Sequence, residues 1–196
     1  MSSDLELKQF SVGPMDNNVY ILVDPVTKDS VLFDAPTEAG RILSALEGTN
    51  LRAILMTHTD GDHVQALRQI REATHAPVGV HRLEADGLPG KAYFEIEDGQ
   101  QLEFGSIHLT ALHTPGHTPG SLSFLTGGIL IAGDTLFPGG PGNTQRPKGS
   151  FDQIIGSIRE KLCVLPDETK VYPGHGGSTT IGTEKPHLQE WIDRGW

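Results

Sequence analysis

Four side chains that can bind a metal ion fall within six residues of this chain: His58, Asp60, Asp62 and His63. Buried carboxylates and imidazoles need partners, so packing alone does not explain such a cluster. The mainly apolar stretch 52–56 before it is typical of a short buried strand, and the spacing of Val64, Leu67 and Ile70 after it is typical of an amphipathic helix. The cluster is therefore predicted on a loop between a strand and a helix, where side chains can converge on one point.

Three later segments carry the same kinds of side chain. The loop HTPGHTPGS, which is rich in proline and glycine, holds His113 and His117. An apolar strand is predicted to deliver Asp134 at its carboxyl end, and a short strand further on delivers His175. The first cluster, one histidine of this loop, Asp134 and His175 could supply seven ligands, which suits two metal ions that share one carboxylate.

These motifs resemble those of the metallo-β-lactamase superfamily and, within it, the small glyoxalase II-like hydrolases. The resemblance runs from about residue 18 to about residue 182 and is carried by NNVY, HTDGDH, HTPGHTPGS, GDTLF and YPGHG in this order. It implies two divalent metal ions bridged by Asp134, one held by His58, Asp60 and His117 and the other by Asp62, His63 and His175.

Position 60 departs from the family pattern, which usually has a histidine where this chain has Asp60. Zinc is the first expectation for both ions. An oxygen ligand, however, shifts the preference towards harder ions such as manganese or iron(II). The identity of the first metal is therefore the point at which this chain is expected to differ.

The resemblance also implies an α/β (α+β) fold, an αββα sandwich of two mixed β-sheets flanked by helices. Local patterns agree with it and predict strands at 19–23 and 30–33, a helix at 38–46, a hairpin at Gly127 and Gly128, and a helix capped by Ser150 with Gln153. A chain of this length is expected to form one domain, residues 1–196. The added C-terminal helical domain of full-length glyoxalase II enzymes is not expected.

Composition narrows the class of partner. The net charge of −10 disfavours nucleic acid, because phosphate binding requires a basic surface, so the expected partner is a small-molecule substrate. Cys163 is the only cysteine, which excludes an internal disulfide and is typical of a small core residue. The first residues lack a signal pattern and the apolar runs are too short to span a bilayer. We therefore expect a cytoplasmic enzyme without a membrane partner, which argues against antibiotic hydrolysis as its task.

The resemblance implies a hydroxide formed at the metals that attacks a carbonyl group, with Asp62 orienting it or accepting its proton. The expected activity is hydrolysis of thioesters of a low-molecular-weight thiol, as in a hydroxyacylglutathione hydrolase. The segment 138–148 is glycine-rich and then basic, and Arg146 and Lys148 are candidate anchors for an anionic substrate. Two solvated surface charges are an equally good interpretation of this pair.

Three alternatives stay open at this point. The same hydroxide could serve a lactone or ester hydrolase. Persulfide dioxygenases share the fold but use one iron ion and oxygen, and metal count and oxygen uptake separate that class. A non-catalytic zinc-binding module is the third, with Asp60 as a sign of decay.

The remaining histidines and both tryptophans are expected to be structural. His113 lies four residues before His117 and is expected to support the ligand rather than to bind metal. The others are expected at the surface or in the core: His75, His81, His108 and His187. Trp191 and Trp196 are predicted to anchor the last helix or to mark a subunit contact.

Overall fold

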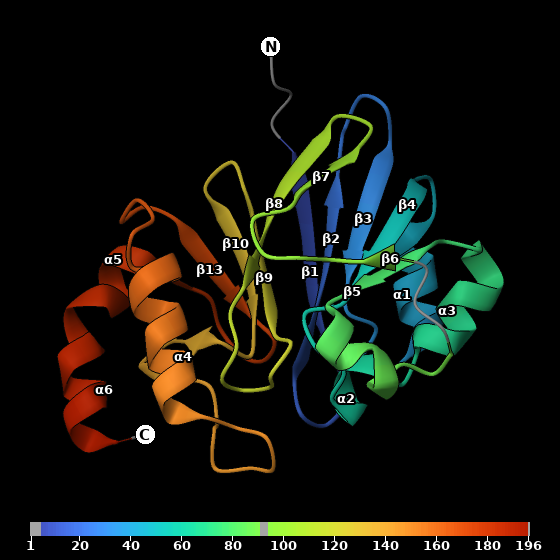
Figure 1. Ribbon diagram of the computed structural model, residues 1–196. Coiled ribbons are helices and arrows are strands. Elements are labelled where there is room, and N and C mark those ends of the chain that lie inside the picture. Colours follow the sequence, from blue (N-terminus) through green and yellow to red (C-terminus); the bar gives the residue numbers. More distant parts are fainter. Residues whose placement is uncertain (1–4, 91–93, 196) are drawn as a thin grey trace.

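The strand β2, Asn17–Val23, is buried at every residue in the computed structural model, which describes residues 5–90 and 94–195. Its side chains alternate between two different cores: Val19 and Ile21 pack into one, and Tyr20 and Leu22 pack into the other. A strand is apolar on both faces only where both faces are covered. In this protein helices cover one face of the sheet and a second sheet covers the other (Figure 1).

The first sheet has six strands in the described residues, in the sequential order β1 to β6. The first three strands pair antiparallel, and β3 to β6 pair parallel. The strands are β1 (Glu6–Val12), β2, β3 (Asp29–Phe33), β4 (Asn50–Leu55), β5 (Val78–Val80) and β6 (Phe94–Glu95).

The second sheet has the strand order β14-β13-β10-β9-β8-β7 within the described part of the chain. The pair β10 and β13 is parallel and the other pairs are antiparallel. Its strands are β7 (Gln101–Phe104), β8 (Ile107–His113), β9 (Leu122–Thr126), β10 (Ile129–Gly133), β13 (Lys170–Pro173) and β14 (Thr179–Thr180). The short strands β11 (Leu136–Phe137) and β12 (Gly140–Pro141) form a separate two-stranded ribbon.

Helices lie on the outer face of each sheet, so the layers follow the order helix, sheet, sheet, helix (Figure 1). The first sheet carries α1 (Ala39–Leu46), α2 (Gly61–Val64) and α3 (Leu67–Thr74). The second carries α4 (Phe151–Ser157), α5 (Ile181–Glu184) and α6 (Leu188–Arg194). Short 3₁₀ helices span Arg82–Gly87 and Lys185–His187, and a π-helical turn, Ile158–Leu162, extends α4. The predicted αββα sandwich of two mixed sheets is thus confirmed.

Several local predictions are confirmed as well. The Gly127-Gly128 pair turns the chain between β9 and β10, with φ angles of 48° and 84° that glycine adopts without strain. The Ser150 side chain accepts a hydrogen bond from the Gln153 backbone N–H and caps α4. Trp191 is only 1% exposed and anchors α6 in the apolar cluster beneath it. Trp196 lies outside the described residues.

Cys163 is half-buried against the same apolar cluster, as predicted for a small packing residue. Among the residues that the structure describes, no helix is long and apolar enough to cross a lipid bilayer.

Parallel pairing brings several strand ends to one edge of the sandwich. The carboxyl ends of β3 and β4 meet there, and so do those of β10 and β13, because parallel neighbours end on the same side. Backbone hydrogen bonds join the two sheets at this edge: Leu122 N donates to Thr57 O over 2.8 Å, and Asn18 N donates to Gly174 O over 2.7 Å. The loops that carry the candidate ligands therefore start from a fixed frame.

Gly116, in the loop that carries His117, lies directly against α4. Its φ is 140°, and a Cβ atom there would lie 2.3 Å from the Ile154 backbone nitrogen. We expect Gly116→Ala to lower the free energy of unfolding by about 1–3 kcal/mol, because backbone cannot move aside as a side chain can. Gly156→Ala, within α4 and with open space around it, is the matched control. It should raise stability by roughly 0.5–1 kcal/mol. Urea denaturation measures the free energy of unfolding of both variants. A Gly116→Ala variant as stable as the unaltered protein would contradict the close packing of Gly116 against α4.

Candidate metal centre

The structure brings His58, Asp60 and His117 together at the shared edge, and this group is called the first site below. His58 follows β4 and is fully buried, Asp60 precedes α2, and His117 comes from the loop between β8 and β9. Asp60 Oδ2 lies 3.1 Å from His117 Nε2 and 3.6 Å from His58 Nε2. Although Asp60 stands at the N-cap of α2, its side chain makes no cap hydrogen bond and turns towards the two histidines instead.

Asp62, His63 and His175 form a second group, called the second site. Both Asp62 and His63 lie in α2, and His175 follows β13. Asp62 Oδ2 lies 3.3 Å from His175 Nε2, and the Nε2 atoms of the two histidines are 3.3 Å apart. In each site, the three ligand atoms lie within 4.8 Å of one another, which suits a single metal ion.

Asp134 lies between the two sites, at the end of β10. Its Oδ2 is 3.5 Å from His117 Nε2 and 3.6 Å from His175 Nε2, and its Oδ1 is 3.7 Å from His63 Nε2. Gly174 is packed against this carboxylate, because a Cβ atom there would lie 2.2 Å from Asp134 Oδ1. All seven residues expected as ligands are therefore side by side, and Asp134 has the position that a bridging ligand requires.

Each of the four histidines makes a hydrogen bond through Nδ1 on the side away from the centre. The partner atoms of Nδ1 are Thr57 Oγ1 for His58 (3.0 Å), Asp34 Oδ2 for His63 (2.9 Å), Asn143 O for His117 (2.8 Å) and Met15 O for His175 (2.8 Å). A carbonyl or carboxylate oxygen accepts only, and the Thr57 hydroxyl already donates its proton to Asp34. Each partner therefore accepts from Nδ1, fixes the proton there and leaves the Nε2 lone pair for a metal. The four imidazoles are thus oriented as metal ligands.

Asp34 is a supporting residue that sequence reasoning missed. It follows β3 and accepts three hydrogen bonds, from the Thr57 N–H and hydroxyl (2.7 Å each) and from His63 Nδ1 (2.9 Å). Its φ of 56° is unusual for a residue other than glycine and is typical of a site where backbone strain is held by tertiary contacts. Its place at the end of a buried strand was the one signal that could have found it.

Asn17 is a second residue without a predicted role. Its side-chain amide donates to Asp62 Oδ2 over 2.8 Å and therefore orients one ligand of the second site. His113 makes no contact with either site; it bonds through Nε2 to Pro119 O over 2.8 Å and stacks on His81. This supports the expectation that His113 is structural.

Two buried ligand atoms point to a cation. His58 Nε2 and Asp134 Oδ1 are the buried side-chain polar atoms, among the described residues, that lack a hydrogen-bond partner. An unpaired buried polar atom is costly, and such atoms occur mainly where an ion or water completes the site. Both atoms face the centre, so the residues fit the divalent ions that the fold family implies.

The electrostatics favour positive charge in the second site. The hydrogen bond with His175, and that with Asn17, hold the pKa of Asp62 below its usual range although burial opposes this. Burial would lower the pKa of His63, but the hydrogen bond with Asp34 and the nearby carboxylates raise it to about 9. The Asp62 carboxylate likewise raises the pKa of His175. The surrounding carboxylates therefore stabilise a cation, either a proton or a metal ion.

Arg146 and Lys148, both predicted as candidate substrate anchors, differ in their distance from the metal centre. The Arg146 guanidinium reaches into the first site and forms a forked ion pair with Asp60, in which Nη2 donates to Oδ1 over 2.6 Å and Nη1 pairs with Oδ2. Burial opposes ionisation of Asp60, but the neighbouring His117 and His58 imidazoles and the Arg146 guanidinium hold its pKa well below the usual range. Lys148 is exposed at the surface of the same loop. The structure thus brings only Arg146 to the metal centre.

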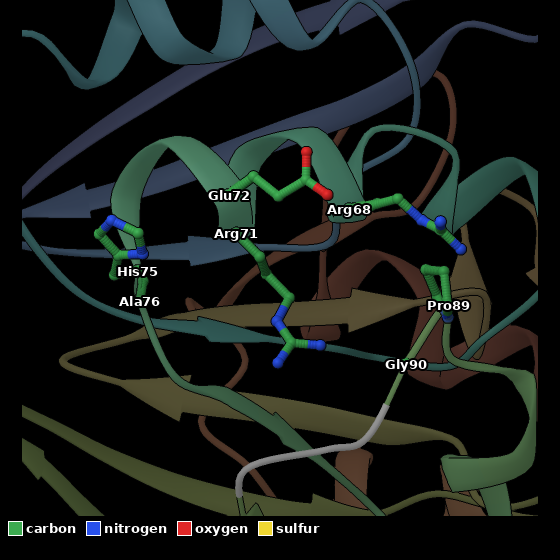
Figure 2. Close-up of a pocket in the computed structure, with 7 residues that line it drawn as sticks. All are labelled: Arg68, Arg71, Glu72, His75, Ala76, Pro89 and Gly90. Carbon is green, nitrogen blue, oxygen red and sulfur yellow. The ribbon is translucent and has the colours of Figure 1, made fainter.

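A separate cavity of about 680 Å³ lies beside α3 (Figure 2). Arg68, Arg71 and Glu72 reach from the helix along it, and His75 lies at the helix end. Its opposite wall ends at Gly90, where the chain continues into residues 91–93, outside the described part. None of its lining residues belongs to the two sites.

Comparison with known proteins agrees with this geometry. Residues 12–175 match the family model described as the metallo-beta-lactamase superfamily. The protein named "Probable metallo-hydrolase YqgX" of Bacillus subtilis (strain 168) is 34% identical, covering 92% of this chain and 95% of that protein. The "Hydroxyacylglutathione hydrolase GloC" of Haemophilus influenzae is 34% identical, covering 81% of this chain and 85% of that protein.

The fold of this chain is also similar to that of solved structures. The BLEG-1 B3 metallo-beta-lactamase has a TM-score of 0.88 at 31% identity, covering 93% of this chain and 98% of that chain. The protein TTHA1623 in a di-iron-bound form has a TM-score of 0.80 at 33% identity, covering 91% of this chain and 96% of that chain. The chain belongs to the metallo-β-lactamase superfamily.

Asp34 tests whether the outer hydrogen bonds matter for the metal. We expect Asp34→Asn to weaken metal binding by about 10–100-fold, because the amide cannot accept from both Thr57 and His63 as the carboxylate does. Asp24→Asn is the matched control: Asp24 is also buried and holds a turn through Val26 N, remote from the centre. It should change stability without changing metal affinity. Calorimetric titration of zinc into both variants gives the comparison, and equal affinities would show that Asp34 does not orient His63.

Proposed function

We propose that the protein is a metal-dependent hydrolase that cleaves thioesters of a low-molecular-weight thiol, in the manner of a hydroxyacylglutathione hydrolase. The observation that carries the hydrolase assignment is the convergence of four imidazole Nε2 atoms and three carboxylates on two adjoining sites. The similarity to a hydroxyacylglutathione hydrolase over most of both chains supports the thioester part.

The proposed cofactors are two divalent ions, one in each site, with Asp134 contacting both. Such ions lower the pKa of water from about 16 towards about 7 and polarise a substrate carbonyl. The first site offers two imidazoles and Asp60, and the second offers two imidazoles and Asp62. Imidazoles suit zinc and iron, whereas carboxylates suit manganese as well, so zinc is proposed first with iron or manganese as alternatives. The di-iron form of a similar protein supports the iron alternative.

Asp62 is proposed to orient the attacking water as well as to bind metal. Its Oδ2 receives the Asn17 amide over 2.8 Å, which fixes the carboxylate at the centre. Because the hydrogen bonds to His175 and Asn17 keep its pKa low, Asp62 stays ionised at neutral pH and can accept a hydrogen bond from water. A fixed carboxylate beside the reacting group reduces the reorganisation that the reaction requires.

A different mechanism, in which a cysteine side chain attacks the substrate, is not supported by the position of the cysteine. Cys163 is the only cysteine of the chain and packs beside the apolar cluster under α4 and α6, not at the shared edge. Burial raises the pKa of its thiol, so little of it is the reactive thiolate at neutral pH. Hydrolysis should therefore not need this residue.

The loop after β12 is proposed to meet an anionic group of the substrate. Arg146 lies at the first site and Lys148 is exposed two residues further on. The protein carries a net charge of −10, and cations at the rim would offset the repulsion that an anionic substrate meets.

The proposal includes a cytoplasmic location, which cell fractionation would test.

A lactone or ester hydrolase would use the same residues, and a β-lactam amide is a further possibility given the similarity to BLEG-1. One observation favours a persulfide dioxygenase with a single iron ion instead: Asp60, a ligand of the first site, is already paired with Arg146. Oxygen uptake separates that class from every hydrolase.

The experiment is a substrate panel run on the metal-loaded protein, with an anionic thioester, a neutral thioester, a lactone, a chromogenic β-lactam and a persulfide. We expect thioester hydrolysis that chelation abolishes and added divalent metal restores. Asp134→Ala should lower kcat/KM by about 100-fold or more, because it removes a carboxylate that faces both sites. Cys163→Ala should remain active, and Lys148→Ala should raise KM for the anionic thioester more than for the neutral one. Oxygen consumption with the persulfide and no hydrolysis of any ester would overturn the proposal.

A further inference from the structure

Arg146 contacts two of the three side chains that the first site offers to a metal. Its Nη1 pairs with Asp60 Oδ2 and lies 2.8 Å from His117 Nε2. Those two acceptor atoms are themselves 3.1 Å apart, and both belong to the first site. A guanidinium is a permanent cation, so it satisfies these lone pairs with positive charge as a metal ion would.

The protonation of His117 fits this arrangement. Its Nδ1 donates to the Asn143 carbonyl over 2.8 Å, so Nε2 carries the lone pair that accepts from Arg146. This is also the tautomer that binds a metal through Nε2. Arg146 and a metal ion would therefore use the same form of His117, and neither requires the imidazole to turn.

The loop that carries Arg146 is tied to the loop that carries His117 at two points. Asn143 O accepts from His117 Nδ1, and Ser150 N donates to Gly116 O over 2.8 Å. Between these points, Gly149 N donates to Arg146 O over 3.0 Å and closes a tight turn. The chain is thus anchored on both sides of Arg146, which delivers the guanidinium to Asp60 while the side chain stays 28% exposed to solvent.

The charge around Arg146 explains why a cation belongs there. Asp60, Asp62 and Asp134 lie together at the centre, and three carboxylates in one partly buried site repel one another. The forked ion pair with Asp60 offsets part of that repulsion. Once a divalent ion binds the same carboxylate, the guanidinium becomes a like charge at short range and is repelled.

We propose that Arg146 competes with the first metal ion for Asp60 and His117, so that the second site fills first and the first site fills only when the Arg146 side chain leaves. Asp60 is what makes this possible, because a neutral histidine at position 60 would not form the forked pair. The inference rests on the proposed metal centre and not on the proposed substrate. Its test measures metal binding, so it stands or fails independently of thioester hydrolysis.

The experiment is a calorimetric titration of Zn²⁺, and separately Mn²⁺, into chelator-treated protein, with elemental analysis of the metal retained after desalting. Arg146→Met keeps an unbranched apolar stem and removes the guanidinium with its charge. We expect it to tighten the weaker binding step by about tenfold or more and to leave the tighter step unchanged, because only the first site loses a competing cation. Arg146→Lys keeps the charge but cannot form the forked ion pair with Asp60. It should therefore show a smaller gain in affinity at the weaker step.

Lys148→Met is the matched control, since Lys148 is an exposed cation on the same loop. It should bind both ions as the unaltered protein does. A second test uses Asp60→His, in which adding Arg146→Met should have little further effect on the weaker step. The proposal is overturned if Arg146→Met binds both ions with unaltered or lower affinity. It is also overturned if Lys148→Met raises the affinity of the weaker step as much as Arg146→Met does. Thermal unfolding of each metal-free variant verifies the fold, and Arg146→Lys decides the question if Arg146→Met does not fold.

Discussion

The arrangement of the molecule depends on holding three carboxylates and four imidazoles in contact at one edge of a β-sandwich. Carboxylates that lie this close repel one another, and His58 Nε2 and Asp134 Oδ1 are buried without partners in the described structure. Two features hold the group together. The parallel pairs β3·β4 and β10·β13 bring their carboxyl ends to the same edge, and every ligand histidine is oriented by an Nδ1 hydrogen bond from outside.

Much of this was predictable from the sequence because it rests on local pattern. The apolar runs predicted the strands, and the HTDGDH run and the strand-end Asp134 predicted ligands whose types are specific to metal chemistry. Asp34 was not predictable in the same way, because its contact with His63 depends on the parallel register of β3 and β4 rather than on any motif. The ion pair of Arg146 with Asp60 joins residues that are 86 positions apart and depends on how one loop is tied to another. A basic residue in a glycine-rich loop does not by itself indicate that its partners are Asp60 and His117.

The departure at position 60 and the position of Arg146 are best understood together. An aspartate in place of the usual histidine adds a negative charge to a metal centre that already holds two other carboxylates, Asp62 and Asp134. Arg146 supplies the opposite charge from a neighbouring loop and makes contact with His117 as well. The exchange of a neutral ligand for a charged one thus creates a partner for an arginine, and through it a means to set how tightly one metal ion binds.

The central claim is that these seven residues hold two divalent ions bridged by Asp134. Crystals grown with saturating zinc, with diffraction data collected on both sides of the zinc absorption edge, test it most directly. We predict two anomalous peaks, one beside His58, Asp60 and His117 and one beside Asp62, His63 and His175, with Asp134 contacting both and the Arg146 side chain moved off Asp60. A single peak that persists under saturating metal, or zinc bound elsewhere, would contradict the claim.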